Sequence, residues 1–200
     1  MIRSSTNSRR RPAIVLAVAL LLAAFLAGCG SGDGPGGDAD ALAAQLPEDG
    51  ALGQGWQRVS GVRIGADAES SGLCDSGLDD GVAAGAKVDF ARGEDFASAY
   101  FRSYADPASA DRAFARAAER IGRCSSSEGL DVRTVAAPAA GDAAYSAVFS
   151  APGADPAAEA ALGWTLVRTG SVVRSLQFIP AAEGSGLDDD LGQLTAALAG

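Results

Sequence analysis

The chain has 200 residues, of which 16 are Lys or Arg and 25 are Asp or Glu, so its formal net charge is −9. A chain with this excess of acidic residues is a poor partner for nucleic acid or for an anionic lipid surface. Histidine is absent, which excludes catalytic triads that contain histidine and zinc sites with histidine ligands.

The N-terminal region carries an apolar run from Ala13 to Ala27 behind a segment with four arginines and no acidic residue. The run is shorter than the roughly 20 residues that span a bilayer, and a basic segment followed by a short apolar one is typical of an export signal. Its boundary, Leu26-Ala27-Gly28-Cys29, resembles the bacterial lipobox. That resemblance implies cleavage before Cys29 and attachment of diacylglycerol to the Cys29 sulfur, with an uncleaved membrane anchor as the alternative.

We therefore expect three segments: a lipoprotein signal peptide over 1–28, a flexible tether over 29–40 and a single domain over 41–200. The tether is rich in Gly, Asp, Pro and Ser and has too little apolar surface to fold. Cleavage would remove the four N-terminal arginines and leave 12 basic and 25 acidic residues, a charge of −13. The abundance of Ala, Gly, Arg and Asp, with Lys87 as the one lysine, indicates a GC-rich genome such as that of an actinobacterium.

The two remaining cysteines, Cys74 and Cys124, form an even pair. In an exported domain such a pair predicts a disulfide. Free thiols or a metal site with two thiolates are the alternatives, but nothing near either cysteine supplies the rest of a coordination shell. We expect no metal and no cofactor.

The first half of the domain is expected to contain a short helix, a strand and a hairpin, at Ala39–Leu46, within Gly55–Ile64, and over Ala86–Phe90 with Asp95–Ala105. The residues between the last two strands, "RGED", are typical of a tight turn. Residues 70–81 are polar and rich in glycine, which predicts a loop.

A long helix is the clearest expected element. Asp106 is a good N-cap, Pro107 suits the first helical position, and Gly122 suits the end. The apolar positions follow helical spacing and are Ala110, Phe114, Ala117, Ala118 and Ile121.

The second half is expected to add strands at Leu130–Val135 and Ala143–Ser150 and a hairpin over 162–179 that turns at Thr169–Gly170. A final amphipathic helix should begin at the acidic cluster Asp188–Asp190, because a helix N-terminus favours negative charge. The fold class is therefore α+β: an antiparallel sheet of about five or six strands packed against one long helix and a C-terminal helix.

Candidate site residues are few. Arg168 and Arg174 lie on adjacent strands of the last hairpin and could converge on an anionic ligand, and Trp164 could line a pocket beside them. The alternatives are arginines paired with local acids on a solvated sheet face and a tryptophan in the core. We find no nucleophile elbow, phosphate loop or calcium loop, so we expect no catalytic residues and no enzyme.

Several motifs together point to a family. The chain has "LPEDGALGQGW", then a cysteine in a polar loop, then "SYADP" ahead of "ASADRAF", a helix that ends in "GRC", and a late "RTGSVV" hairpin. Over residues 42–199 this pattern resembles the extracellular sensor domain of the mycobacterial serine/threonine kinase H and the lipoproteins that share it, the PknH-like sensor domains. The resemblance implies an antiparallel sheet packed on helices around a cleft for a small ligand, a Cys74–Cys124 disulfide and no catalytic residue.

Taken together, the sequence predicts a lipoprotein anchored on the extracytoplasmic face of the cell membrane, with a non-catalytic ligand-binding or sensor-like domain. Its expected partners are the membrane, through the lipid, and an unknown small ligand or envelope protein, but no nucleic acid. The alternative is a structural or protein-interaction module of the cell envelope. A hydrolase that uses carboxylates alone is a third hypothesis.

Overall fold

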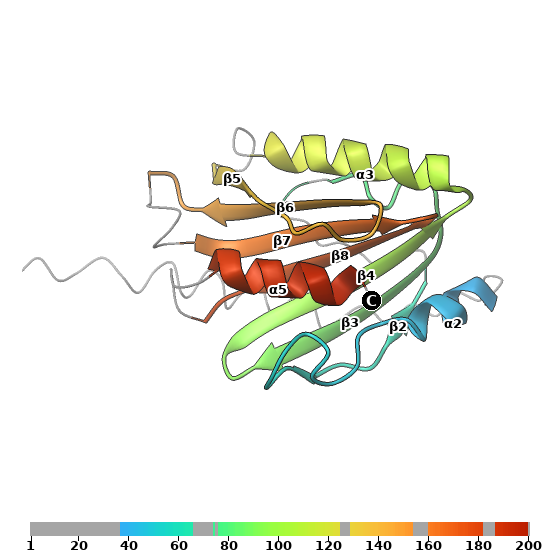
Figure 1. Ribbon diagram of the computed structural model, residues 1–200, viewed down its shortest axis with the longest axis horizontal. Coiled ribbons are helices and arrows are strands. Elements are labelled where there is room, and N and C mark those ends of the chain that lie inside the picture. The colour runs from blue at the N-terminus through green and yellow to red at the C-terminus, as the bar shows by residue number, and fades with distance from the viewer. Residues whose placement is uncertain are drawn as a thin grey trace, which may run out of the picture. The chain divides into compact units, whose positions relative to one another are not determined.

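An antiparallel sheet dominates the computed structural model, which describes residues 37–65, 74, 76–124, 129–153, 160–181 and 187–199 (Figure 1). The elements are α2 Gly37–Ala43, β1 Gln57–Arg58, β2 Arg63–Ile64, β3 Val82–Arg92, β4 Asp95–Tyr104, α3 Pro107–Gly122, β5 Asp131–Val135, β6 Ala143–Ser150, β7 Ala160–Thr169, β8 Val172–Ile179 and α5 Leu187–Ala199. The α+β class is confirmed.

The strands are arranged in the order β1-β3-β4-β8-β7-β6-β5, with β2 also paired to β3. Two parts of the sheet, the β3–β4 hairpin and the β5-β6-β7-β8 meander, meet where β4 pairs with β8. In that pairing Tyr100 lies opposite Ser175 and Arg102 opposite Val173. The centre of the sheet is therefore built by residues about 70 positions apart in the chain.

The sheet of the described residues has eight strands, so the expectation of five or six was too low. The single strand expected within Gly55–Ile64 is in fact two strands of two residues each, β1 and β2, both paired with β3. Between them the Val59 amide still donates to the Asp89 carbonyl. The chain thus follows the edge of β3 without keeping a continuous ladder. The first helix also differs, since it begins at Gly37 and ends at Ala43.

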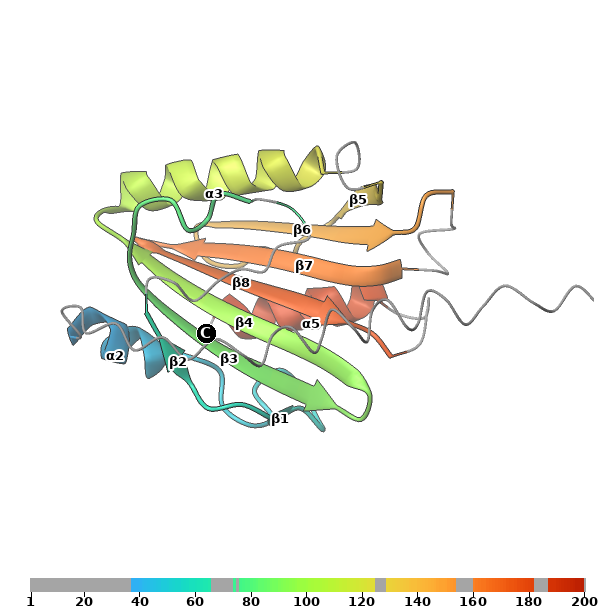
Figure 2. The ribbon, with the colours of Figure 1, turned by 180° about the vertical axis from the view of Figure 1, so that it is seen from behind.

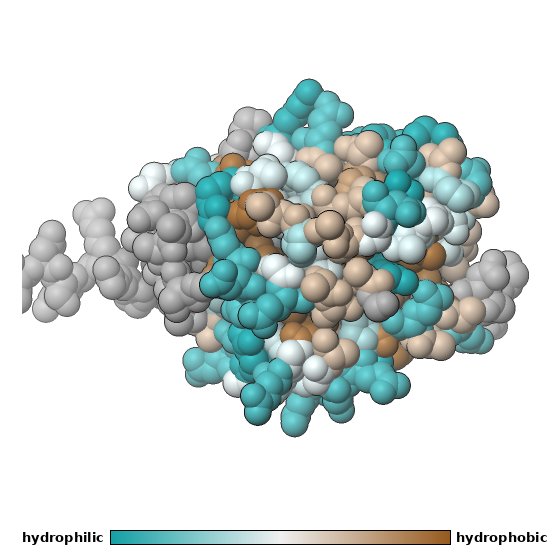
Figure 3. Space-filling view, in the orientation of Figure 1, coloured by the Kyte–Doolittle hydropathy of each residue, from teal (hydrophilic) through white to brown (hydrophobic). Residues whose placement is uncertain are grey.

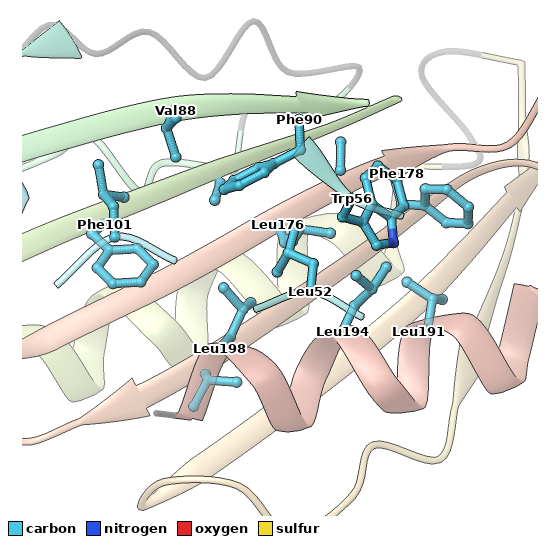
Figure 4. Packing of buried hydrophobic residues seen from close by; sticks show 14 of the residues in the cluster. Leu52, Trp56, Val88, Phe90, Phe101, Leu176, Phe178, Leu191, Leu194 and Leu198 are labelled. Atoms are coloured by element: carbon cyan, nitrogen blue, oxygen red, sulfur yellow. The ribbon is translucent and has the colours of Figure 1, made fainter. Parts of the chain in front are cut away.

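One face of the sheet, here called the front face, is covered by α5 and α2 (Figure 1). Figure 4 shows side chains of β3, β4 and β8 packed against the leucines of α5. The helix lies very close to β7 at Gly163, where an added Cβ would be 2.6 Å from Leu191 Cδ2. Viewed from this side, hydrophilic residues lie around the edge of the molecule and less polar ones lie over its middle (Figure 3).

The opposite face, here called the back face, has its own core beneath α3 (Figure 2). The Asp106 carboxylate accepts a hydrogen bond of 2.7 Å from the Ser109 amide, as expected of an N-cap. The buried residues of the helix are Ala110, Ala113, Ala117 and Ile121. Phe114 was expected in this line, but it packs only at the margin of the core, because Ala113 occupies the central position.

A disulfide joins Cys74 to Cys124, with their Cα atoms 5.8 Å apart. Both cysteines are buried in the back-face core. The bond links the end of α3 to the segment before β3, and that segment includes Leu78 and Asp79. The disulfide expected from the sequence is therefore present in the structure.

Candidate functional site

A group of polar side chains lies on the back face of β3, β4 and β8, beside the part covered by α3. Of the helices in the described ranges, none lies over the middle of β3 and β4 on this side (Figure 2). Strand alternation places these residues opposite the front-face core. The group, here called the back-face polar cluster, consists of Lys87, Asp89, Ser98, Tyr100, Arg102 and Ser175. All six are less than 9% exposed.

Arg102 is the most deeply buried cation of the cluster, with 2% of its surface exposed. Its Nε donates to Asp79 Oδ1 at 2.6 Å, and its Nη1 donates to Ser175 Oγ at 3.2 Å. Its Nη2 is buried and has no hydrogen-bond partner within the part of the chain that the structure describes. Asp79 is itself 43% exposed, so the ion pair joins the interior to the surface.

Asp89 is held by several donors at once. Its carboxylate accepts from Ser98 Oγ at 2.7 Å and from Arg63 Nη2 at 2.7 Å, and Lys87 Nζ lies 3.4 Å away. Burial by itself would raise the pKa of Asp89. The Ser98 hydrogen bond and the charges of Lys87 and Arg63 outweigh it, so the pKa lies below its usual value. Asp89 is therefore a firmly ionised carboxylate.

Tyr100 lies directly opposite Lys87 in the β3–β4 register and two residues before Arg102. Lys87 Nζ is 4.7 Å from the centre of its ring, and the Arg102 guanidinium carbon is 5.1 Å away. Both distances are within the range of a cation–π interaction. The buried ring thus lies next to concentrated positive charge.

The segment after Cys74 closes one end of the cluster. The hydroxyl of Tyr104 donates to the Leu78 carbonyl, and Asp79 follows directly as the partner of Arg102. Burial raises the pKa of Tyr104 to about 12, so its hydroxyl stays a donor. The position of Asp79 is consequently fixed by Tyr104 and by the disulfide.

The three ligand residues expected from the sequence do not lie together. Trp164 is buried in the back-face core beside Phe149. Arg168 lies near the end of β7 and pairs with Asp111 and Asp142.

Arg174 points to the front face instead, because it lies opposite Val167 in the β7–β8 register. There its Nη1 donates to the carbonyls of Leu198 and Ala199 at 2.9 Å each and so caps α5. Arg168 and Arg174 therefore do not converge, since one residue of offset between paired strands puts them on opposite faces.

Neither a metal site nor a membrane-spanning helix is found in the described ranges. They contain no group of three or more Cys, Asp or Glu side chains placed to bind a metal. They also contain no helix long and apolar enough to cross a bilayer. Cys29 and the expected signal peptide lie outside the described residues.

Comparison with known proteins gives a match among solved structures. No family model matches the sequence, and no curated protein does. Among solved structures, the crystal structure of the extracellular domain of PknH from Mycobacterium tuberculosis superposes with a TM-score of 0.57. The match covers 80% of this chain and 94% of that domain at 11% sequence identity. This chain has the fold of the PknH extracellular domain. The resemblance expected from the sequence is thus confirmed at the level of fold.

The back-face polar cluster was not found from the sequence. The usable signal was alternation in β3 and β4, where Lys87, Asp89 and Arg102 interrupt strands whose other residues are mostly apolar. Alternation of this kind normally indicates a solvated sheet face. Only the structure shows that these charges are buried.

Proposed function

We propose that this chain is a lipid-anchored protein on the extracytoplasmic face of the cell membrane, and that its domain binds a small ligand without converting it. The observation that carries the proposal is the back-face polar cluster, in which charged and aromatic side chains are buried together. Binding sites combine a largely apolar surface with a few well-placed polar groups. The cluster supplies the polar groups, and the ring of Tyr100 lies beside them.

Two further observations support the location. The fold matches an extracellular domain, although a likeness in fold does not by itself carry function. The lipobox at Leu26–Cys29 supplies the expected anchor. A two-chain lipid holds a protein at the membrane where a single chain would not.

The chemistry of the cluster favours binding over catalysis. A general base needs a pKa near the working pH, whereas the pKa of Asp89 is below its usual value. Its carboxylate is already engaged by Ser98, Arg63 and Lys87. These contacts leave it a poor proton acceptor.

Binding is tested by a thermal-shift screen of the purified full chain against a broad panel of small metabolites. At least one compound is expected to raise the melting temperature. Lys87→Gln should abolish that rise, while Arg112→Gln, which removes the same charge from an exposed position on α3, should preserve it. If no compound stabilises the protein, ligand binding is wrong. If both variants respond like the parent, the assignment of binding to the back-face polar cluster is wrong.

Anchoring is tested by Cys29→Ser in cells fed labelled palmitate. The parent should be labelled and sediment with membranes, and the variant should be unlabelled and released. A variant that stays fully membrane-bound, beside an unlabelled parent, would contradict the lipoprotein assignment.

A protein-interaction module of the envelope is the second candidate, favoured by three exposed apolar residues near the edge of β3. Val59, Val62 and Ile64 are 56%, 38% and 49% exposed. Exposed apolar residues beside a sheet edge are typical of contact surfaces. Val62→Ser combined with Ile64→Ser should abolish a stoichiometric partner in crosslinking, without changing ligand-induced stabilisation.

A further inference from the structure

The unpaired nitrogen of Arg102 is the feature of the cluster that its internal contacts leave unexplained. A guanidinium presents its donors as a planar fork. In Arg102 the Nε and Nη1 atoms have partners, but Nη2 has none among the residues described. A buried charged donor without an acceptor is costly.

An arginine–carboxylate pair elsewhere in the chain shows how the donors of a guanidinium are usually satisfied. Arg133 donates from Nη1 to Asp188 Oδ2 at 3.0 Å and from Nη2 to Asp188 Oδ1 at 2.8 Å. This is the two-bond geometry typical of a structural arginine–carboxylate pair. In the Arg102 pair, Asp79 Oδ1 accepts from Nε at 2.6 Å, and Nη2 of Arg102 is left without an acceptor among the described residues.

Among the described residues, the two carboxylates in or directly bonded to the cluster are both already engaged. Asp79 pairs with Nε of Arg102, and Asp89 pairs with Arg63 and Lys87. Asp89 cannot neutralise Arg102, because its oxygens are already bonded to Ser98 and Arg63.

We infer that Nη2 of Arg102 receives an anionic oxygen, carboxylate or phosphoryl, from a small organic ligand that contacts the ring of Tyr100. This inference rests on the proposed binding function and assigns its ligand class. Ser175, already bonded to Nη1, lies on the adjacent strand and holds the fork in place. Lys87 adds a second positive charge beside the same ring.

The inference is tested by calorimetric titration of the full chain at constant ionic strength with matched probes. Acetate is compared with acetamide, and glycerol 3-phosphate with glycerol, so that the two arms separate a carboxylate from a phosphoryl ligand. The anionic member of at least one pair should bind about tenfold or more tightly than its neutral counterpart, as expected for a hydrogen bond to a charged group.

Two variants should act in opposite directions. Arg102→Gln should weaken anion binding at least about tenfold, whereas Asp79→Asn should strengthen it, because it removes a competing negative charge. Arg133→Gln, which breaks the satisfied pair, is the matched control and should leave binding unchanged. If Arg102→Gln does not fold, Asp79→Asn and the probe pairs still decide the question.

Equal binding of anionic and neutral probes, or weaker anion binding in Asp79→Asn, overturns the inference. In that case a compound from the broad panel that still binds leaves the ligand-binding function intact. If neither the anions nor any panel compound binds, both the inference and the proposed function are wrong.

Discussion

Removal of the Cys74–Cys124 bond should strongly destabilise the domain. The two cysteines are 50 residues apart in the chain. In the chain-entropy model, a loop of that length lowers the entropy of the unfolded state by about 14 cal/mol/K, or about 4 kcal/mol at 25 °C. This is a large share of the 5–15 kcal/mol that typically stabilises a domain.

The assay is urea unfolding of the Cys74→Ala/Cys124→Ala variant, followed by tryptophan fluorescence. Trp56 lies in the front-face core and Trp164 in the back-face core, so the signal reports on both. With a slope of about 2 kcal/mol per molar urea, the midpoint should fall by about 2 M. Addition of reductant should move the parent toward the variant and leave the variant unchanged.

A midpoint that falls by less than about 0.5 M would refute the reasoning. It would mean that the unfolded chain is already compact around residues 74–124. The loop entropy used above would then not be available to the disulfide.

Three further outcomes are expected from the structure. Gly163→Val should cost about 1–3 kcal/mol in chemical unfolding by overpacking, because the space beside Gly163 is filled by buried Leu191; a loss below about 0.5 kcal/mol would contradict so close a contact. Arg174→Met should lower the midpoint of unfolding and raise amide exchange in the last turn of α5, because the hydrogen bonds from Arg174 to the carbonyls of Leu198 and Ala199 are lost; unchanged exchange there would refute the capping role of Arg174. Asp89 has a lower pKa in the folded state than its usual 3.8, so the stability it provides is present above that value and lost as pH falls toward the folded pKa; stability measured from pH 5 to 2 should fall less steeply in Asp89→Asn, and an equal slope would contradict the assignment.

Local signals in the sequence were sufficient for most elements. Asp106 and Pro107 mark the start of α3, and the turn between Arg92 and Asp95 marks the β3–β4 hairpin; both are confirmed. These features depend only on neighbours in the chain.

The site could not be predicted because it depends on pairing between distant strands. Nothing near Arg102 in the sequence indicates that Ser175 becomes its neighbour, or that Asp79 lies within hydrogen-bond distance of it. The expected pair of Arg168 and Arg174 failed for the same reason. Their relative faces are decided by the register of β7 on β8, which composition and periodicity do not specify.

The pairing of β4 with β8 also has a consequence for how the domain is made. The partners are separated by 83 residues at one end of the pair, Phe96 with Ile179, and by 69 at the other, Ser103 with Val172. Non-local pairing of this kind slows folding, because a long loop must close before any contact compensates for its entropy. During synthesis the β3–β4 hairpin is complete before β8, so the long edge of β4 stays unpaired until β8 has been made. An unpaired strand edge favours intermolecular association. We therefore expect assembly of the sheet to be a late event, and nascent copies of the chain to need protection from one another until their C-terminal strand is complete.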